Sequence, residues 1–374
     1  MSTERVAARI RGAVAARTPL RISGASTWLD AGRPVSAKET LSLRGDSGVV
    51  SYVPGDLTLT VRAGTSLAEI ERVTAEHDQW LPLDPYGSAE GTIGATISTA
   101  SAGPLATGFG LPRDLVLGME FVSGRGEVIT CGGKVVKNVA GFDLTRLLTG
   151  SWGSLGVITE VTLRLYARPK VDRTFVVRLS GNGSDAAFLE GFLAARLSPF
   201  AFEILSASAV KALDLGNRAI CLIRFGGNAA GVDGQLAALA QLGRSEEIDA
   251  KLWSRLRNLE NGADCVIRVS GPPANFRDAS PAILSDDLPE VLTWISPARG
   301  LLRLVTREPS DGIASDDPVP EIDPRARPDE HTVFEKLPTA GWRDIPSAVS
   351  DRLSQRIKRV FDGDNLLNPG ILGS

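Results

Sequence analysis

The stretch that decides the fold is GGKVVKNVAGFDLTRLLTGSWGSLGVITEVTLRLYARP, residues 132–169. It carries six glycines around one short apolar segment. Asp143 suits the N-cap of a helix over 144–148, and Gly150 suits its C-terminal end. The stretch therefore predicts a short helix between two glycine-rich turns.

The same stretch then passes from a turn into a strand. Gly153 and Gly156 frame the start of a run over 157–166 in which residue types alternate. Such alternation predicts a strand, and glycines at this junction allow a positive φ or a close approach of backbone to a ligand. The stretch thus predicts the floor of a ligand cleft. Lys137 and Asn138, before the helix, suit contact with a ligand or with a partner protein, and the sequence does not choose between them.

Upstream of this stretch, short strands outnumber helices. Residues 57–62 alternate apolar and polar side chains, and Ser66 with Glu69 forms a capping box for the helix that follows. Residues 114–133 are typical of a hairpin that turns at 123–126. Short alternating strands favour antiparallel or mixed sheets over the βαβ winding of a Rossmann domain.

The pattern changes near residue 170, where strand-like and helix-like segments begin to alternate. This predicts an α+β domain made of one sheet with helices on a face. Residues 246–260 are expected to form one helix, and a last amphipathic helix is expected at about 345–361. Residues 309–330, rich in Pro and Asp, are expected to form a surface loop.

Composition excludes several function classes. The chain has 374 residues, is 43% hydrophobic, and carries 41 basic against 44 acidic residues. That length and apolar content predict a large core divided between two domains, and the near balance of charge predicts no global attraction to nucleic acid. Three separated cysteines and two histidines match no iron–sulfur or multi-histidine metal site. No apolar run is long enough to predict a transmembrane segment.

Two stretches of small residues are candidate ligand loops. Ser23 to Thr27 follow a strand-like run, and their backbone N–H groups suit an anion nest for a pyrophosphate; an ordinary strand-ending loop is the alternative. Residues 91–104 are almost all Gly, Ala, Ser or Thr, which indicates that a flat, partly polar ligand fills the volume beside them. A low-complexity linker is the alternative there. Neither GxGxxG after a strand nor GxxxxGK[ST] occurs.

Taken in order, RISGAST (21–27), LPLDPYGSAEGTIGATISTASAGP (81–104), the long stretch from Leu111 to Leu165 and the terminal LLNPG (366–370) resemble the FAD-linked oxidase family of the vanillyl-alcohol oxidase and para-cresol methylhydroxylase (PCMH) superfamily. Within it, the order of motifs is most similar to the FAD-binding E subunits of bacterial glycolate oxidases. The resemblance is strong over about 20–169, moderate in the C-terminal helix and tail, and weaker between.

The resemblance implies an α+β fold: a two-subdomain PCMH-type FAD-binding domain over 1–169, an α+β cap domain over 170–351, and a C-terminal segment over 352–374 that returns to the FAD domain. It implies that the FAD pyrophosphate lies at 23–27 and that Asn368 approaches the flavin ring. The residues implied to bind the cofactor are Ser23, Gly24, Ala25, Ser26, Thr27, Pro85, Thr92, Gly94, Ala95, Ser98, Arg113, Asp114, Gly153, Gly156, Val157, Ile158 and Asn368.

Two departures limit the carry-over. Family members with covalent flavin carry a His or Cys in the pyrophosphate loop or near the small-residue run, and this chain has neither there, so noncovalent FAD is expected. The cap-domain histidines that bind metal and deprotonate a 2-hydroxy acid in the catalytic subunit type are missing too, since this cap has only His331. No catalytic base and no metal site are predicted. Arg224, Arg268 and Arg303 on expected cap strands are candidates for binding a substrate carboxylate, although strand arginines more often form salt bridges.

The resulting hypothesis is a subunit that takes part in oxidation of glycolate or a related small 2-hydroxy acid and passes electrons through FAD to a partner. The expected partners are a second flavoprotein subunit and an iron–sulfur subunit, with a cytoplasmic location and attachment to the inner membrane only through partners. A stand-alone FAD oxidase or dehydrogenase of another hydroxy acid or alcohol remains an alternative. So do a noncatalytic flavin-containing assembly subunit and a reductase of the cell-wall precursor type.

Overall fold

The structure, a computed structural model, describes residues 2–133, 143–180, 183–276, 291–307 and 331–373. Contacts divide it into two compact units. Unit 1 comprises 1–106, 110–168 and 339–374, and unit 2 comprises 107–109 and 169–338. Lys137, Asn138 and the expected loop over 309–330 lie outside the described residues. No described helix is long and apolar enough to cross a membrane.

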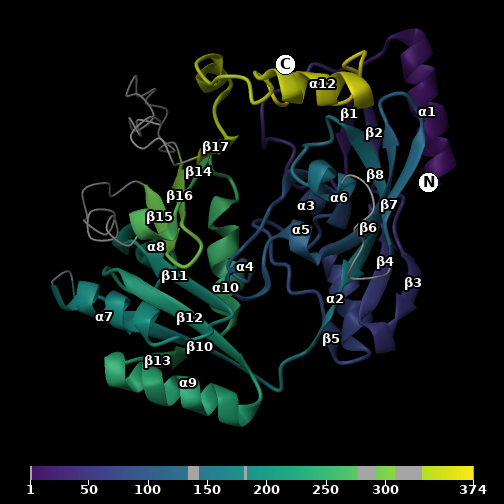
Figure 1. Cartoon of the computed structure of the whole chain (residues 1–374). Coiled ribbons are helices and arrows are strands. Elements are labelled where there is room, and N and C mark those ends of the chain that lie inside the picture. The colour runs from purple at the N-terminus through teal and green to yellow at the C-terminus, as the bar shows by residue number, and fades with distance from the viewer. Residues whose placement is uncertain (1, 134–142, 181–182, 277–290, 308–330, 374) are drawn as a thin grey trace. The chain divides into compact units, whose positions relative to one another are not determined.

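Unit 1 is organised around a five-stranded antiparallel sheet (Figure 1). The expected strand at 57–62, the hairpin and the long strand of the opening stretch all belong to it, and the Ser123 N–H donates to Glu127 O to close the hairpin. The strand order is β3 (Val49–Val53), β4 (Thr58–Arg62), β8 (Gly156–Arg164), β6 (Val116–Ser123) and β7 (Val128–Gly132). The α+β class and the antiparallel pairing are therefore confirmed.

Smaller elements surround this sheet. A parallel pair, β1 (Leu20–Ser23) and β2 (Glu39–Ser42), and an antiparallel pair, β5 (Gln79–Trp80) and β9 (Tyr166–Ala167), complete the strands. The helices are α1 (Thr3–Ala16), α2 (Leu67–Ala75), α3 (Ile93–Thr99), α5 (Pro112–Leu115), α6 (Leu144–Leu148) and α12 (Arg352–Phe361), with short 3-10 turns η1 (Pro54–Asp56) and η3 (Thr339–Arg343). The short helix α4 (Ala106–Phe109) begins in unit 1, and its residues 107–109 belong to unit 2. Asp143 and Ser66 cap α6 and α2 as expected.

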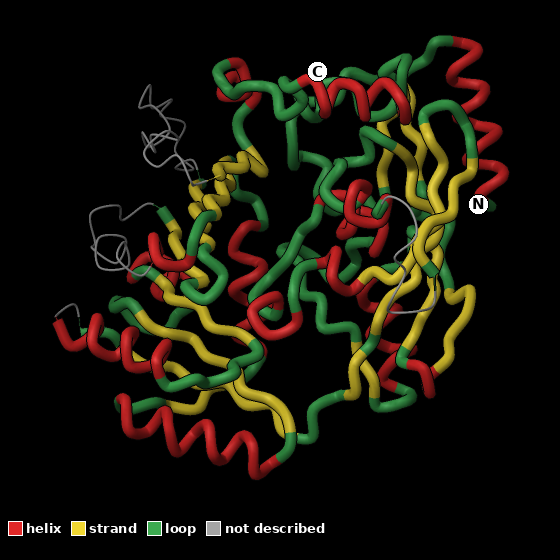
Figure 2. The backbone as a smooth tube through the Cα atoms, in the orientation of Figure 1, coloured by secondary structure: helices red, strands yellow, loops and turns green. Residues whose placement is uncertain are grey.

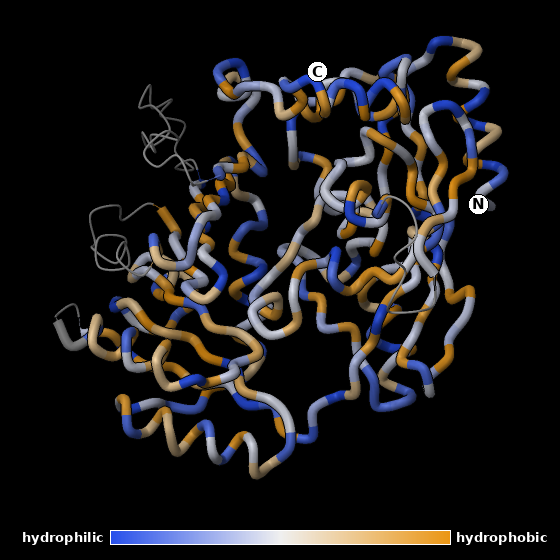
Figure 3. Tube along the Cα trace, viewed as in Figure 1, coloured by the Kyte–Doolittle hydropathy of each residue, from blue (hydrophilic) through white to orange (hydrophobic). Residues whose placement is uncertain are grey.

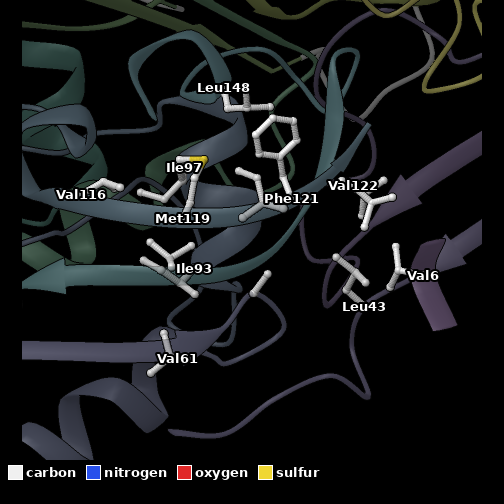
Figure 4. Packing of buried hydrophobic residues seen from close by; sticks show 14 of the residues in the cluster. Val6, Leu43, Val61, Ile93, Ile97, Val116, Met119, Phe121, Val122 and Leu148 are labelled. Atoms are coloured by element: carbon white, nitrogen blue, oxygen red, sulfur yellow. The ribbon is translucent and has the colours of Figure 1, made fainter. Parts of the chain in front are cut away.

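The core of unit 1 joins the sheet to α1 and α3 (Figure 4). Ile93 and Ile97, one turn apart on α3, are fully buried, as are Phe121 of β6 and Val161 of β8. Burial of each such side chain stabilises the fold by about 1.5–3 kcal/mol. The small-residue run over 91–104 is therefore ordered, and part of it is a helix: Thr92 caps α3 by accepting from the Ala95 N–H.

Unit 2 is built on an eight-stranded sheet, whose strands are yellow in Figure 2. Every pairing in this sheet is antiparallel. The strand order is β13 (Glu246–Ile248), β10 (Val171–Arg178), β12 (Ile220–Gly227), β11 (Ala201–Leu205), β15 (Leu292–Ser296), β16 (Leu301–Thr306), β14 (Cys265–Ser270) and β17 (His331–Lys336). Its helices are α7 (Gly183–Ala194), α8 (Ala207–Ala212), α9 (Ala229–Leu242) and α10 (Lys251–Arg257), followed by the 3-10 turn η2 (Asn258–Glu260).

Two helix predictions were wrong in their bounds. The expected helix over 246–260 begins only at Lys251, because residues 246–248 pair with β10 at the edge of the sheet. The expected helix over 345–361 begins at Arg352, where the Asp351 carboxylate accepts the N–H groups of Leu353 and Ser354. Helical periodicity therefore failed to predict the start of either helix. A strand pairing delays the first helix, and an N-cap fixes the start of the second.

The chain returns to unit 1 earlier than the expected 352. Unit 1 already includes residues from Thr339 onward. Arg33 donates to the carbonyls of Trp342, Ile345 and Pro346, and the Ala348 N–H donates to Leu372 O. These bonds tie the turn and loop before α12 to the first unit.

Candidate cofactor site

A pocket in unit 1 gathers most of the predicted cofactor residues. The loop after β1, the helix α3, the turn into β8 and the C-terminal tail all contribute to its wall. Fourteen of the seventeen predicted residues line it: Ser23, Gly24, Ala25, Ser26, Thr27, Thr92, Gly94, Ala95, Ser98, Gly153, Gly156, Val157, Ile158 and Asn368.

The loop over 24–27 offers hydrogen-bond donors. Among the described residues, no group accepts from its four backbone N–H groups. Ser26 holds a left-handed φ of 64°, a conformation that successive N–H groups of an anion nest commonly require. The hydroxyl of Ser23 is buried without a hydrogen-bond partner in the described chain. Backbone N–H groups that no protein group accepts remain available to an anion, so this loop fits a pyrophosphate.

Glycines at two positions are required by protein packing. A Cβ on Gly24 would lie 2.1 Å from Thr92 Oγ1, and one on Gly94 would lie 2.7 Å from Ala63 Cβ and 2.9 Å from Ala63 O. The small side chains over 91–104 were expected to bring backbone close to a ligand. At Gly94 the close neighbour is Ala63, the residue that follows β4. The missing side chain of Gly94 therefore lets α3 pack closely on the sheet.

The turn over 151–156 forms another part of the wall. Trp152 and Gly153 both have left-handed φ values, 53° and 68°, and the Trp152 ring stacks on Trp28 with centroids 5.8 Å apart. The Gly153 N–H has no acceptor within the described ranges. Strained backbone of this kind gathers at binding sites.

Asn368 lines the pocket, but its side-chain amide is already engaged. Its Oδ1 accepts from the Ile22 N–H at 2.7 Å, and its Nδ2 donates to Trp152 O at 2.8 Å. Asn368 is predicted to approach the flavin ring, and it also has a structural role, since its side chain links β1 to the turn over 151–156.

Three predicted residues lie outside the pocket wall. Pro85 is buried away from it. Arg113 and Asp114 belong to the short helix α5, where Asp114 Oδ2 accepts from the Leu111 N–H at 2.9 Å and so caps the helix. The Asp114 carboxylate thus has a capping role in α5.

Sequence reasoning missed two aromatic residues of the wall, Trp28 and Trp152. It also missed Ile22, Leu43 and Ala63, whose side chains make part of the wall apolar. A signal existed for the tryptophans, because each stands beside a small-residue run in a chain with only six. The apolar residues looked like ordinary strand residues.

The three cap arginines have partners already. Arg224 makes a bidentate pair with Asp172, at 2.8 and 2.6 Å, and Arg268 donates to Glu335. Arg303, 2% exposed, donates to Glu260 and Glu335, each at 2.6 Å. Each therefore serves a salt bridge, the more common role of strand arginines.

The Glu260 carboxyl makes the stability of unit 2 depend on pH. Burial raises its pKa to about 7 and Glu335 adds to the rise, although Arg303 opposes it. At Glu335 burial is outweighed by Arg303 and Arg268, which lower the pKa. Between pH 4.5, the ordinary pKa of Glu, and pH 7 the folded state therefore holds more protons at Glu260 than the unfolded state does.

We therefore predict that this group lowers the free energy of unfolding as pH rises from about 5 to 7. Glu260→Gln should remove the part of this decline in the free energy of unfolding that Glu260 causes. The contribution of Glu335 changes only at pH values below about 5, because its pKa is lowered. Urea unfolding of both proteins at several pH values checks it. Parallel pH profiles for the two proteins would show that Glu260 does not titrate there.

Comparisons with known proteins agree with this geometry. Residues 1–132 match the model of a family described as "FAD binding domain". The chain is 34% identical over 251 residues to "Glycolate oxidase subunit GlcE" of Escherichia coli K12, covering 67% of this chain and 66% of that protein. It is 32% identical over 190 residues to "Glycolate oxidase subunit GlcD" of Bacillus subtilis 168, covering 50% and 40%. The chain thus spans just under two thirds of the first relative and less than half of the second.

The fold matches that of a solved oxidase. The structure of 4-ethylphenol oxidase from Gulosibacter chungangensis superimposes with a TM-score of 0.68 at 16% identity, covering 100% of this chain and 88% of that one. The matched domain and the relatives identify the chain as an FAD-binding protein. The chain belongs to the FAD-linked oxidase family with a PCMH-type fold.

Proposed function

We propose that this protein is a subunit that takes part in oxidation of glycolate or a related small 2-hydroxy acid to the 2-oxo acid, with electrons passing through noncovalent FAD to a partner subunit. The observation that carries the proposal is the pocket of unit 1, which joins the unpaired N–H groups of residues 24–27 to an apolar wall. Its described wall contains no His or Cys, which supports dissociable flavin.

The cofactor, when bound, supplies a two-electron acceptor. Oxidation of a 2-hydroxy acid releases two electrons and two protons, and it needs a base for the hydroxyl proton and a cation for the carboxylate. Arg224, Arg268 and Arg303 are held by carboxylates of the protein itself. This supports a role in which a second flavoprotein subunit oxidises the substrate and this subunit passes the electrons on to an iron–sulfur subunit.

Two relatives are named as subunits of glycolate oxidase, which supports an assembly of several chains for this protein as well. We place that assembly in the cytoplasm or at the inner membrane, attached through partners. Direct oxidation by this chain alone and a purely structural flavin are the other outcomes that an experiment must separate.

The test is anaerobic reduction of the purified chain. We expect the FAD-loaded chain to keep its visible flavin absorbance when glycolate is added alone, and to lose it when the co-expressed partner subunits are present. Bleaching by glycolate alone would mean direct catalysis. Flavin that stays oxidised in the complete, active assembly would mean a structural cofactor. D-Lactate and D-2-hydroxyglutarate in place of glycolate distinguish the substrates.

A further inference from the structure

The turn over residues 151–156 is held in place from the far end of the chain. Asn368 Nδ2 donates to Trp152 O at 2.8 Å, and Lys358 Nζ donates to Ser154 O at 2.9 Å. Within unit 1 the Trp152 N–H also donates to Ser98 O, the Ser154 N–H to Ser151 O and the Ser151 N–H to Leu148 O. The position of this pocket wall therefore depends on the C-terminal segment.

The Lys358 ammonium reaches the turn as part of a buried ion pair. It lies 2.6 Å from Asp362 Oδ2, and the two side chains are 11% and 0% exposed. The Asp362 carboxylate also accepts the N–H groups of Leu366 and Leu367 at 3.0 and 2.9 Å. Separating such a pair would leave a buried charge uncompensated. The ion pair and the two backbone hydrogen bonds therefore hold Lys358, Asp362 and the turn that leads to Asn368 together.

Asn368 extends this unit to the loop expected to hold the pyrophosphate. Its Oδ1 accepts from the Ile22 N–H, and its own N–H donates to Leu20 O at 3.0 Å. Residues 24–27 follow directly. The same C-terminal residue thus positions both walls that present unpaired N–H groups to the pocket.

The outer side of the C-terminal segment is open to solvent. Leu353 and Val360 of α12 are 66% and 60% exposed, the largest values among the large hydrophobic side chains of the described chain, and Arg352, Arg356 and Arg359 of the same helix are exposed too. Hydrophilic and hydrophobic residues alternate along this helix (Figure 3). An element held from one side only is a candidate for local opening at low free energy.

We infer that FAD binding and docking of segment 352–371 are energetically coupled through Lys358, Asp362 and Asn368, which we name the C-terminal clamp. The inference rests on the proposed cofactor pocket. A ligand that binds only when both walls are in place stabilises the docked segment, and the docked segment raises the affinity for the ligand by the same factor. Lys358 and Asp362 are positioning residues, since neither is among the residues that line the pocket.

Limited trypsin digestion of the full chain tests the coupling, because Arg352, Arg356 and Arg359 are exposed on α12. With FAD at about 100 times its Kd, we expect cleavage within α12 to slow at least about tenfold in the wild type. Lys358→Met should raise the Kd of FAD about tenfold or more. At equal FAD concentration it should lose most of the protection.

Arg356→Met is the matched control, since it removes an exposed positive charge from the same helix and, like Lys358→Met, leaves three trypsin sites there. It should keep the wild-type Kd and protection. If Lys358→Met does not fold by circular dichroism, Asp362→Asn replaces it, because the amide oxygen still accepts a backbone N–H. A folded clamp variant with wild-type Kd and protection, or wild-type cleavage unaffected by bound FAD, would overturn the coupling. A pocket-blocking variant that still binds FAD would instead overturn the location of the cofactor.

Discussion

Ala95→Trp is expected to abolish FAD binding while leaving the apoprotein as stable as the wild type. Ala95 lies on α3, is exposed, and lines the pocket. An indole there would occupy ligand space and would displace none of the buried core residues of α3. We expect the Kd of FAD to rise more than about 100-fold, a loss of about 2.7 kcal/mol, measured by titration of flavin fluorescence and by flavin content after gel filtration.

The control is Ala8→Trp, which places the same ring at an exposed position of α1 outside the pocket. It should bind FAD as the wild type does. Normal FAD content in Ala95→Trp would mean that the cofactor lies elsewhere. Gly94 is a poorer choice for this test, because a Cβ there meets Ala63 and would impair folding and binding together.

Arg303→Met should destabilise unit 2 by about 3–5 kcal/mol, because it removes the guanidinium that the buried carboxyl groups of Glu260 and Glu335 share and leaves Glu335 with Arg268 alone. All three side chains are less than a tenth exposed. Urea unfolding followed by circular dichroism measures the change. Neutralising Glu260 as well, in Arg303→Met/Glu260→Gln, should recover part of the loss.

Arg224→Met is the matched control among the cap arginines. Its ion pair with Asp172 is partly exposed, at 16% and 28%, so solvent screens the charge left behind and the expected loss is about 1 kcal/mol or less. Equal losses in the two variants would show that burial does not govern these pairs. If Arg303→Met is as stable as the wild type but its assembly no longer oxidises glycolate, Arg303 binds the substrate carboxylate instead of stabilising the fold.

Particular residues show how far sequence reasoning reached. The strand at 57–62, the caps Ser66 and Asp143 and the hairpin at 123–126 were predicted because each depends on a few neighbouring residues. The edge strand at 246–248 was missed, since only its pairing with β10 makes it a strand. Pro85, Arg113 and Asp114, expected at the cofactor, proved to lie outside the pocket wall.

The order of glycine-rich and small-residue stretches, read without coordinates, determined the family, the α+β class and most residues of the pocket. Left-handed backbone, close packing and donor-rich loops restrict which residue types are allowed, and such restrictions are visible in a sequence. Only the tertiary structure decided which predicted groups are free for a ligand. It pairs Arg303 with buried carboxylates and joins Asn368 and Lys358 to the turn over 151–156. Those contacts join residues up to 216 positions apart, and pairing at that range leaves no periodic pattern in the sequence.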